Sequence, residues 1–108
     1  MPDISDWERL AVRVGTVIRA EINEGSQRPS YALWIDFGEL GELQSSAQLT
    51  DRYRPEDLVR RQVAAVTGFP PLRIGGFRSD VLVLGAIVDG AVVLLRPDSE
   101  VPPGSIVA

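Results

Sequence analysis

The sequence predicts an all-β protein that folds as one small barrel. Three observations support this class: alternating apolar residues recur along the chain, strong turn signals separate them, and the one clear helical pattern in the interior is short. A chain of 108 residues has the usual size of a single domain. Residues 1–108 are therefore expected to form one domain with its own core.

The first predicted strand covers residues 12–20. Apolar or small side chains alternate there with the charged Arg13 and Arg19, and a period of two residues is typical of a half-buried strand. Gly15 within this run predicts a bend or a bulge. The side chains expected on the buried face are Val12, Val14, Thr16, Ile18 and Ala20.

Four more strands, one helix and one hairpin follow. RPEDLV (54–59) predicts a short helix, because Pro55 suits the first helical position and Glu56 and Asp57 suit its positive end. Asp89-Gly90 predicts a two-residue hairpin turn into AVVLL (91–95). The other predicted strands are YALWIDF (31–37), LQSSAQL (43–49), QVAAVT (62–67) and VLVLGAIV (81–88).

Three strands, a short helix and two further strands follow each other in the order of an OB-fold, a five-stranded Greek-key barrel. The long, bent first strand agrees with this fold, because such a strand serves both halves of the barrel. The AVVLL strand would lie outside the five-stranded barrel as part of an added C-terminal hairpin. A generic small sandwich is the alternative.

The residue inventory argues against an enzyme. The chain has no cysteine and no histidine, so the commonest metal ligands and the commonest general base are absent. Ser45 and Ser46 have neither a histidine nor a lysine to activate them. Glu56 and Asp57 are typical of helix capping. We expect no catalytic activity, no cofactor and no metal.

Nothing in the sequence predicts a membrane partner or secretion. The N-terminus, MPDISDWERL, is acidic and lacks the apolar core of a signal peptide. The longest uncharged apolar run, residues 81–88, is far shorter than the roughly 20 residues that a spanning helix needs. We expect a cytoplasmic protein that binds neither membranes nor DNA.

Positive charge is concentrated in one segment of an acidic chain. The net charge is −4, but residues 52–78 hold six arginines against two acids. A local patch of this kind can bind phosphates or an acidic partner whatever the total charge. A solvated basic face is the alternative interpretation.

The basic segment ends in GFPPLRIGGFRS (68–79), an irregular stretch that is longer than most loops. Aromatic and arginine side chains together can stack on bases and neutralise phosphates, and prolines would stiffen such a surface. Alternatively, both phenylalanines turn inward and plug an open end of the barrel. The residues predicted to carry the surface are Phe69, Pro70, Pro71, Arg73, Phe77 and Arg78.

Apolar residues near both termini predict a subunit interface. A small barrel need not bury them itself, and an exposed apolar patch usually marks an interaction site. We therefore expect an obligate homodimer. The residues expected at its interface are Trp7 and Leu10 on a short N-terminal turn, with Val101 and Ile106 in the tail.

Four blocks of the sequence resemble the EMAP-type tRNA-binding domain family. They are RVGTVIRAE (13–21), IDFGELGELQSSAQLTDRYRPEDLVRRQV (35–63), GFPPLRIGGFRSDVLVLGA (68–86) and VVLLRPDSEVPPG (92–104), in the family's order. The family includes stand-alone tRNA-binding proteins and C-terminal extensions of methionyl-tRNA synthetases. The QSSAQ, FPP and GFRSDVLVLG blocks are most similar to its CsaA branch, which is described as a group of export-related chaperones.

The resemblance implies an OB-fold homodimer whose termini contribute to the interface. It also implies that Gly76 to Ser79 lies near the ligand surface, and that Ser79→Ala affects tRNA binding with little effect on stability. Leu82 stands where tRNA-binding members commonly carry Met, and Ser45-Ser46 replaces an Ile-Val pair. These departures favour the chaperone branch, whose proposed ligand is an unfolded peptide.

Three functions remain open from the sequence. The first is chaperone-like binding of unfolded or export-destined polypeptides, through Phe69, Pro70, Pro71 and Phe77. The second is structure-specific tRNA binding in trans without a chaperone role, through Arg52, Arg54, Arg73, Arg78 and, by the resemblance, Ser79. The third is a structural dimer module that recruits another protein.

Overall fold

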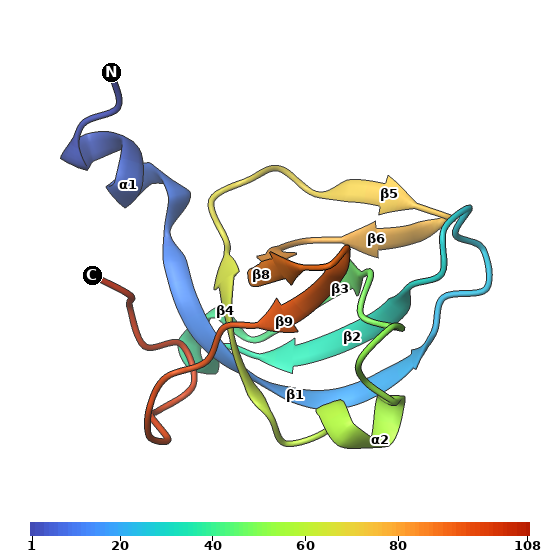
Figure 1. The fold of residues 1–108 in the computed structure, drawn as a ribbon. Helices are drawn as coiled ribbons and strands as arrows, with labels where there is room; N and C mark the ends of the chain where they lie inside the picture. The colour runs from blue at the N-terminus through green and yellow to red at the C-terminus, as the bar shows by residue number, and fades with distance from the viewer.

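Five antiparallel strands curve into a nearly closed barrel in the computed structural model of the protein, which describes residues 1–108 (Figure 1). The order of the strands in the sheet is β3-β2-β1-β4-β7. The predicted OB-fold is confirmed. The barrel strands are β1 (Val12–Ile22), β2 (Tyr31–Asp36), β3 (Glu42–Ala47), β4 (Gln62–Val66) and β7 (Leu82–Val83).

Hydrogen bonds at Gln44 close the barrel between β3 and the residues just before β7. The backbone oxygen of Gln44 accepts from the N–H of Asp80 at 2.7 Å and from that of Val81 at 3.3 Å. The Asp80 carboxylate accepts in return from the Gln44 N–H at 2.9 Å. A single residue of β3 therefore fixes where the last barrel strand begins.

β1 is the long, bent strand that the sequence predicts, but its buried face differs from the expected alternation. Phe37 packs directly on Gly15, where a Cβ would lie 2.8 Å from the ring. A register shift against β2 follows between Val17 and Arg19. Because a bulge changes the direction of the side chains around it, Val17 is fully buried and Ile18 is 47% exposed. The expected burial of Ile18 is wrong.

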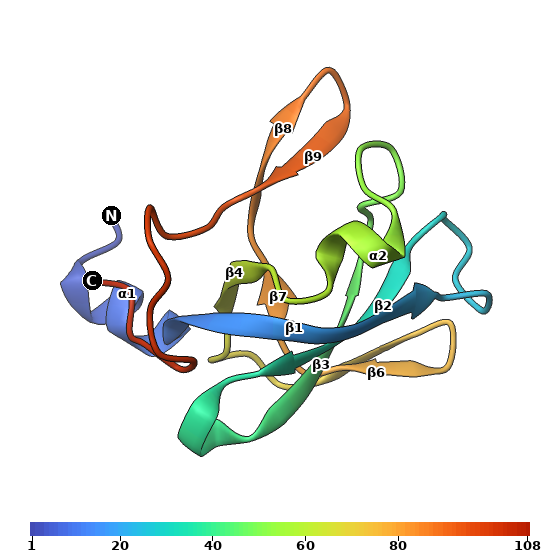
Figure 2. The same cartoon turned by 90° about the horizontal axis from the view of Figure 1, so that it is seen from below.

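The predicted helix α2 (Pro55–Leu58) lies next to β1 (Figure 2). Its Leu58 is fully buried and belongs to the core. A short 3-10 turn, η1 (Gly38–Leu40), joins β2 to β3. The core contains Val17, Tyr31, Leu33, Ile35, Phe37, Leu49, Leu58, Val63, Ala65, Val81 and Leu94.

A hairpin of β5 (Leu72–Ile74) and β6 (Phe77–Ser79) lies within the segment that the sequence predicts to be irregular. Gly75 and Gly76 connect the strands, with φ angles of 60° and 78°. Two successive positive φ angles match the twist of a two-residue hairpin turn. The segment therefore contains a regular β-hairpin, whereas the sequence predicts an irregular stretch.

A second hairpin, β8 (Gly85–Val88) with β9 (Ala91–Leu94), extends away from the barrel (Figure 2). The predicted single strand over residues 81–88 is wrong, because β7 ends at Val83 and β8 pairs with β9 alone. The predicted turn at Asp89-Gly90 is confirmed, with φ angles of 50° and 79°.

Both ends of the chain lie on the same side of the barrel (Figures 1 and 2). α1 (Ile4–Leu10) is capped by Asp3, and the hydroxyl and amide of Ser5 donate to that carboxylate and lower the pKa of Asp3. The C-terminal tail runs along β1, where the Val107 N–H donates to the Val12 oxygen at 3.0 Å. No helix of the protein has the length and apolar character needed to cross a membrane.

Candidate binding face of the barrel

Arg19, Trp34 and Gln44 lie side by side on the outside of the barrel. Arg19 pairs with Trp34 across β1 and β2, and Trp34 pairs with Gln44 across β2 and β3. Directly paired residues share one face of a sheet. The guanidinium carbon of Arg19 lies 4.3 Å from the centre of the Trp34 ring. Glu21 holds this guanidinium through hydrogen bonds of 3.0 and 2.6 Å.

Phe77 packs against Trp34 from β6. The two ring centres are 5.5 Å apart and the ring planes meet at 81°, a favourable edge-to-face arrangement. Phe77 lies outside the core, and Phe69 is 48% exposed. The alternative that the phenylalanines plug the barrel is therefore wrong. We call Arg19, Trp34, Gln44 and Phe77 the aromatic face.

The β5–β6 hairpin is attached to β3 by polar groups. The Gln44 side-chain amide donates to the Arg78 oxygen at 3.0 Å. The Ser79 hydroxyl accepts from the Ser46 N–H at 3.1 Å and donates to the Val81 oxygen at 3.2 Å. Ser79 is only 9% exposed. Its hydroxyl thus holds the hairpin on the barrel, which opposes the expectation that Ser79→Ala would leave stability nearly unchanged.

Arg73 and Arg78 project from the other face of the hairpin. They pair directly with each other, whereas Phe77 pairs with Ile74, and successive residues of a strand point to opposite faces. Like charges directly opposite each other repel. Asp80 offsets this repulsion by accepting from the Arg78 Nε at 2.7 Å. Arg73 forms no ion pair, so its charge is available to a ligand.

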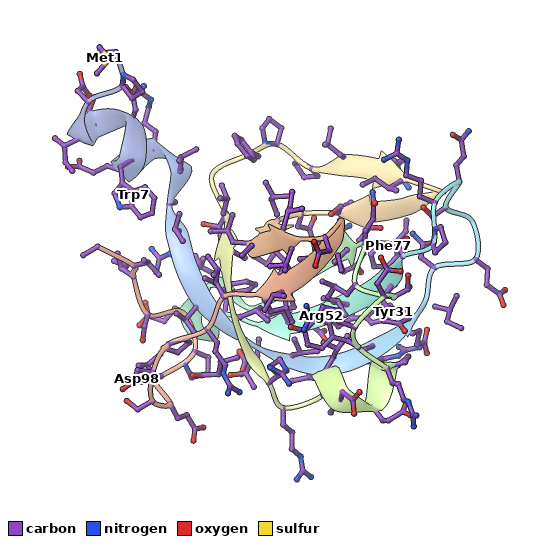
Figure 3. The ribbon with its side chains drawn as sticks, in the orientation of Figure 1. Met1, Trp7, Tyr31, Arg52, Phe77 and Asp98 are labelled. Carbon is purple, nitrogen blue, oxygen red and sulfur yellow. The ribbon has the colours of Figure 1, made fainter.

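The other residues predicted for this site lie elsewhere. Arg52 and Arg54 are exposed next to α2, on the opposite side of the barrel from β5 and β6 (Figures 1 and 2; Arg52 is labelled in Figure 3). Phe69 lies beside α1, where it lines a hollow together with Leu10. Pro70 and Pro71 are exposed between Phe69 and β5. The structure therefore divides the predicted site among three places.

Arg19 and Trp34 were missed from the sequence. The segment YALWIDF does contain a signal for Trp34, because Tyr31, Leu33 and Ile35 alternate toward the core and Trp34 must then point outward. A large aromatic residue on an outer face is an interaction signal. Arg19 has no comparable local signal.

An apolar hollow of about 410 Å³ lies between α1 and the C-terminal tail. Trp7 and Ile106 line it, and Figure 3 shows Trp7 on the side of α1 that faces the tail. The Trp7 Nε1 donates to the Val107 oxygen at 3.3 Å. Of the other residues predicted for the interface, Leu10 lies at the Phe69 hollow, and Val101 is hydrogen-bonded to Gln62.

The family model described as putative tRNA binding domain matches residues 12–106. The chain belongs to the tRNA-binding domain family. The match covers the whole barrel, both hairpins and nearly all of the tail, so it confirms the resemblance seen in the sequence.

Two methionine–tRNA ligases resemble this tRNA-binding domain over most of its length. The enzyme of Methanothrix thermoacetophila is 42% identical over 98 residues, which is 91% of this chain and 14% of the enzyme. The enzyme of Methanococcoides burtonii is 35% identical over 104 residues, 94% of this chain and 15% of the enzyme. The chain thus spans only a small part of these curated relatives.

Crystal structures of two chaperones named CsaA match the entire fold of this tRNA-binding domain. The protein of Bacillus anthracis str. Ames has a TM-score of 0.93 and 50% identity, over 100% of this chain and 99% of that one. The protein of Picrophilus torridus has a TM-score of 0.93 and 38% identity, over 100% of both chains. The similarity to the CsaA branch is confirmed.

Proposed function

We propose that this protein is a non-catalytic RNA-binding protein whose ligand is tRNA. One observation carries the proposal: on the outside of an OB barrel, a guanidinium lies over a tryptophan ring and a phenylalanine packs edge-on against the same ring. Stacking of a base on an aromatic ring contributes about 1–3 kcal/mol. OB-folds bind oligonucleotides through the face that their second and third strands form, which is where Trp34 and Gln44 pair.

Phosphate contacts come from the neighbouring hairpin in this proposal. Arg73 is exposed and free of ion pairs, and it is the strongest candidate for a backbone phosphate. Arg78 shares its charge with Asp80 and contributes less. The net charge of −4 disfavours nonspecific attraction, so affinity depends on this local arrangement.

Binding of unfolded polypeptide is the second candidate, and the free edge of β5 supports it. β5 pairs only with β6, and its Leu72 and Ile74 are 66% and 37% exposed. An exposed edge strand can add an extended peptide through backbone hydrogen bonds. The similarity to structures named as CsaA chaperones agrees with this function, and a role in protein export would be a special case of it.

A homodimer in the cytoplasm is the proposed working form. Every residue of β8 is exposed, and Ile87 is 79% exposed. An isolated two-stranded hairpin is marginally stable in water. Ile4 and Ile106, near the hollow between the termini, are also more than 70% exposed. A second copy of the chain would cover these surfaces in an isologous interface.

One competition experiment on the purified protein distinguishes tRNA from unfolded polypeptide as its ligand. The chain has two tryptophans, so Trp7→Phe leaves Trp34 as the only indole emitter. We expect tRNA to quench Trp34 fluorescence saturably. A denatured client polypeptide should displace the bound tRNA only if both ligands use the aromatic face. Saturable binding of the polypeptide with none of tRNA would overturn the RNA proposal in favour of the second candidate.

A further inference from the structure

A polar hollow of about 530 Å³ lies away from the aromatic face, between the turn before β4 and the segment that follows β9. Figure 3 shows Asp98, at its rim, far from Phe77. Pro97 is the only residue with an apolar side chain that lines this hollow, and the others are polar or charged. Its residues are Arg60, Arg61, Gln62, Arg96, Pro97, Asp98, Ser99 and Glu100.

Three arginines meet at this hollow without forming ion pairs. The three ion pairs of the structure use Arg9, Arg19 and Arg78, and none of these lines the hollow. Asp98 and Glu100 also lie on its walls, but their carboxylates are not within ion-pair distance of a guanidinium. The hollow therefore has an excess of positive charge that the protein does not neutralise by contact.

Arg61 has a buried donor that the protein leaves without an acceptor. Its Nε is the one buried side-chain nitrogen or oxygen of the chain that lacks a hydrogen-bond partner. The guanidinium is held 5.2 Å from the centre of the Tyr53 ring. Leaving a buried donor unpaired costs about 1–3 kcal/mol, and an acceptor from outside the chain would remove this cost.

The backbone around these arginines is held in a strained and rigid form. Arg60 has a φ of 74°, a left-handed conformation that is unfavourable for a residue with a Cβ. Its N–H donates to the Val17 oxygen at 2.7 Å, and the Arg61 oxygen accepts from the Val17 N–H at 2.9 Å. Strain of this kind is common at functional sites.

The Gln62 side chain links the two walls of the hollow through hydrogen bonds. Its side-chain amide donates to the Val101 oxygen at 2.7 Å, and its side-chain oxygen accepts from the Val101 N–H at 3.0 Å. The same amide donates to the Thr16 hydroxyl at 3.1 Å. The arginines on one wall and the 96–100 segment on the other are thus preorganised around a common space.

We infer that this hollow is a second binding site, for a phosphate group. Guanidinium forks bind phosphate oxygens through paired, charge-assisted hydrogen bonds. Arg60, Arg61 and Arg96 provide three such forks, and the Ser99 hydroxyl is a further donor. The polar walls suit an oxyanion rather than an apolar side chain. The phosphate can belong to an RNA backbone or to a small phosphate compound, and both sources offer the same chemistry.

Nuclear magnetic resonance of the full chain tests this inference with two probes. Pyrophosphate represents the small phosphate compound, and a short oligoribonucleotide without terminal phosphates represents the RNA backbone. Each probe is titrated into the protein at constant ionic strength, and a titration with sodium chloride is the reference. We expect saturable shifts of the Arg61 Nε–H signal and of the amides of Ser99 and Glu100 with at least one probe. The probe that produces them identifies the source.

Two variants and a control make the test specific. Arg96→Gln and Arg60→Asn each remove one fork, and asparagine tolerates the left-handed backbone of Arg60. We expect each to weaken binding about tenfold, the effect of losing one charge-assisted contact. Arg28→Gln makes the same charge change at an exposed arginine outside the hollow and should have no effect. Absence of saturable shifts with both probes, or equal weakening by Arg28→Gln, would overturn the inference.

Discussion

Arg19 and Trp34 pair directly across β1 and β2, with the guanidinium carbon 4.3 Å from the centre of the indole ring. Phe77 meets the same indole edge-on from a different part of the chain. Three residues separated in sequence thus form one surface with an aromatic and a cationic part. The first prediction concerns this surface.

Trp34→Ala should weaken tRNA binding by roughly tenfold or more, because a stacked base contributes about 1–3 kcal/mol. Trp34→Phe keeps an aromatic ring at the same place and should retain most of the affinity. Filter binding at fixed salt measures both. Circular dichroism of each variant checks that the barrel is intact. Equal affinity of the alanine variant and the unaltered protein would place the RNA elsewhere.

The salt dependence of tRNA binding should identify which arginines contact phosphates. Each lost phosphate contact removes roughly 0.7–0.9 from the slope of log affinity against log salt. We expect Arg73→Ala with Arg78→Ala to reduce the slope, with most of the effect from Arg73, because Asp80 already engages Arg78. Arg52→Ala with Arg54→Ala removes the same number of positive charges on the opposite side of the barrel and should leave the slope unchanged. The reverse pattern would assign the RNA to the α2 side.

Ser79→Ala should lower the free energy of unfolding by about 1–3 kcal/mol, because it leaves the Ser46 N–H without its acceptor. Urea denaturation followed by circular dichroism measures the change. Ser26→Ala is the matched control, since the Ser26 hydroxyl makes no hydrogen bond within the protein. If both variants are equally stable, the hairpin does not depend on Ser79, and the residue is free for a ligand as the family resemblance implies.

The exposed hairpin should be needed for dimer formation. We expect sedimentation equilibrium of the unaltered protein at micromolar concentration to give twice the chain mass of 11.8 kDa. Ile87→Asp introduces a charge on β8 and should shift the mass toward the monomer. Ile22→Asp at the end of β1 is the control, because it changes an isoleucine that is also exposed, at 66%. This variant should keep the mass of the dimer. A monomer mass for the unaltered protein would exclude the homodimer.

The sequence by itself determined the class of fold and the order of its elements. Period-two alternation and turn chemistry are local properties, so the strands, the helix at Pro55 and the turn at Asp89-Gly90 could be read from neighbouring residues. The hairpin around Gly75-Gly76 was also within reach, because two glycines between short apolar runs are a recognised hairpin signal. The length of the stretch over residues 68–79 favours one long loop instead.

The tertiary structure alone decided which residues meet at the candidate site. Arg19 and Trp34 meet because of the pairing register of β1 and β2, and the bulge in β1 helps to set which residues of that strand face outward. The pairing of β5 with β6 turned Phe77 and the two arginines of the hairpin to opposite faces. Closure at Gln44 placed that hairpin on β3 and away from α2. Register and closure depend on hydrogen bonds between distant residues, so no local pattern in the sequence contains them.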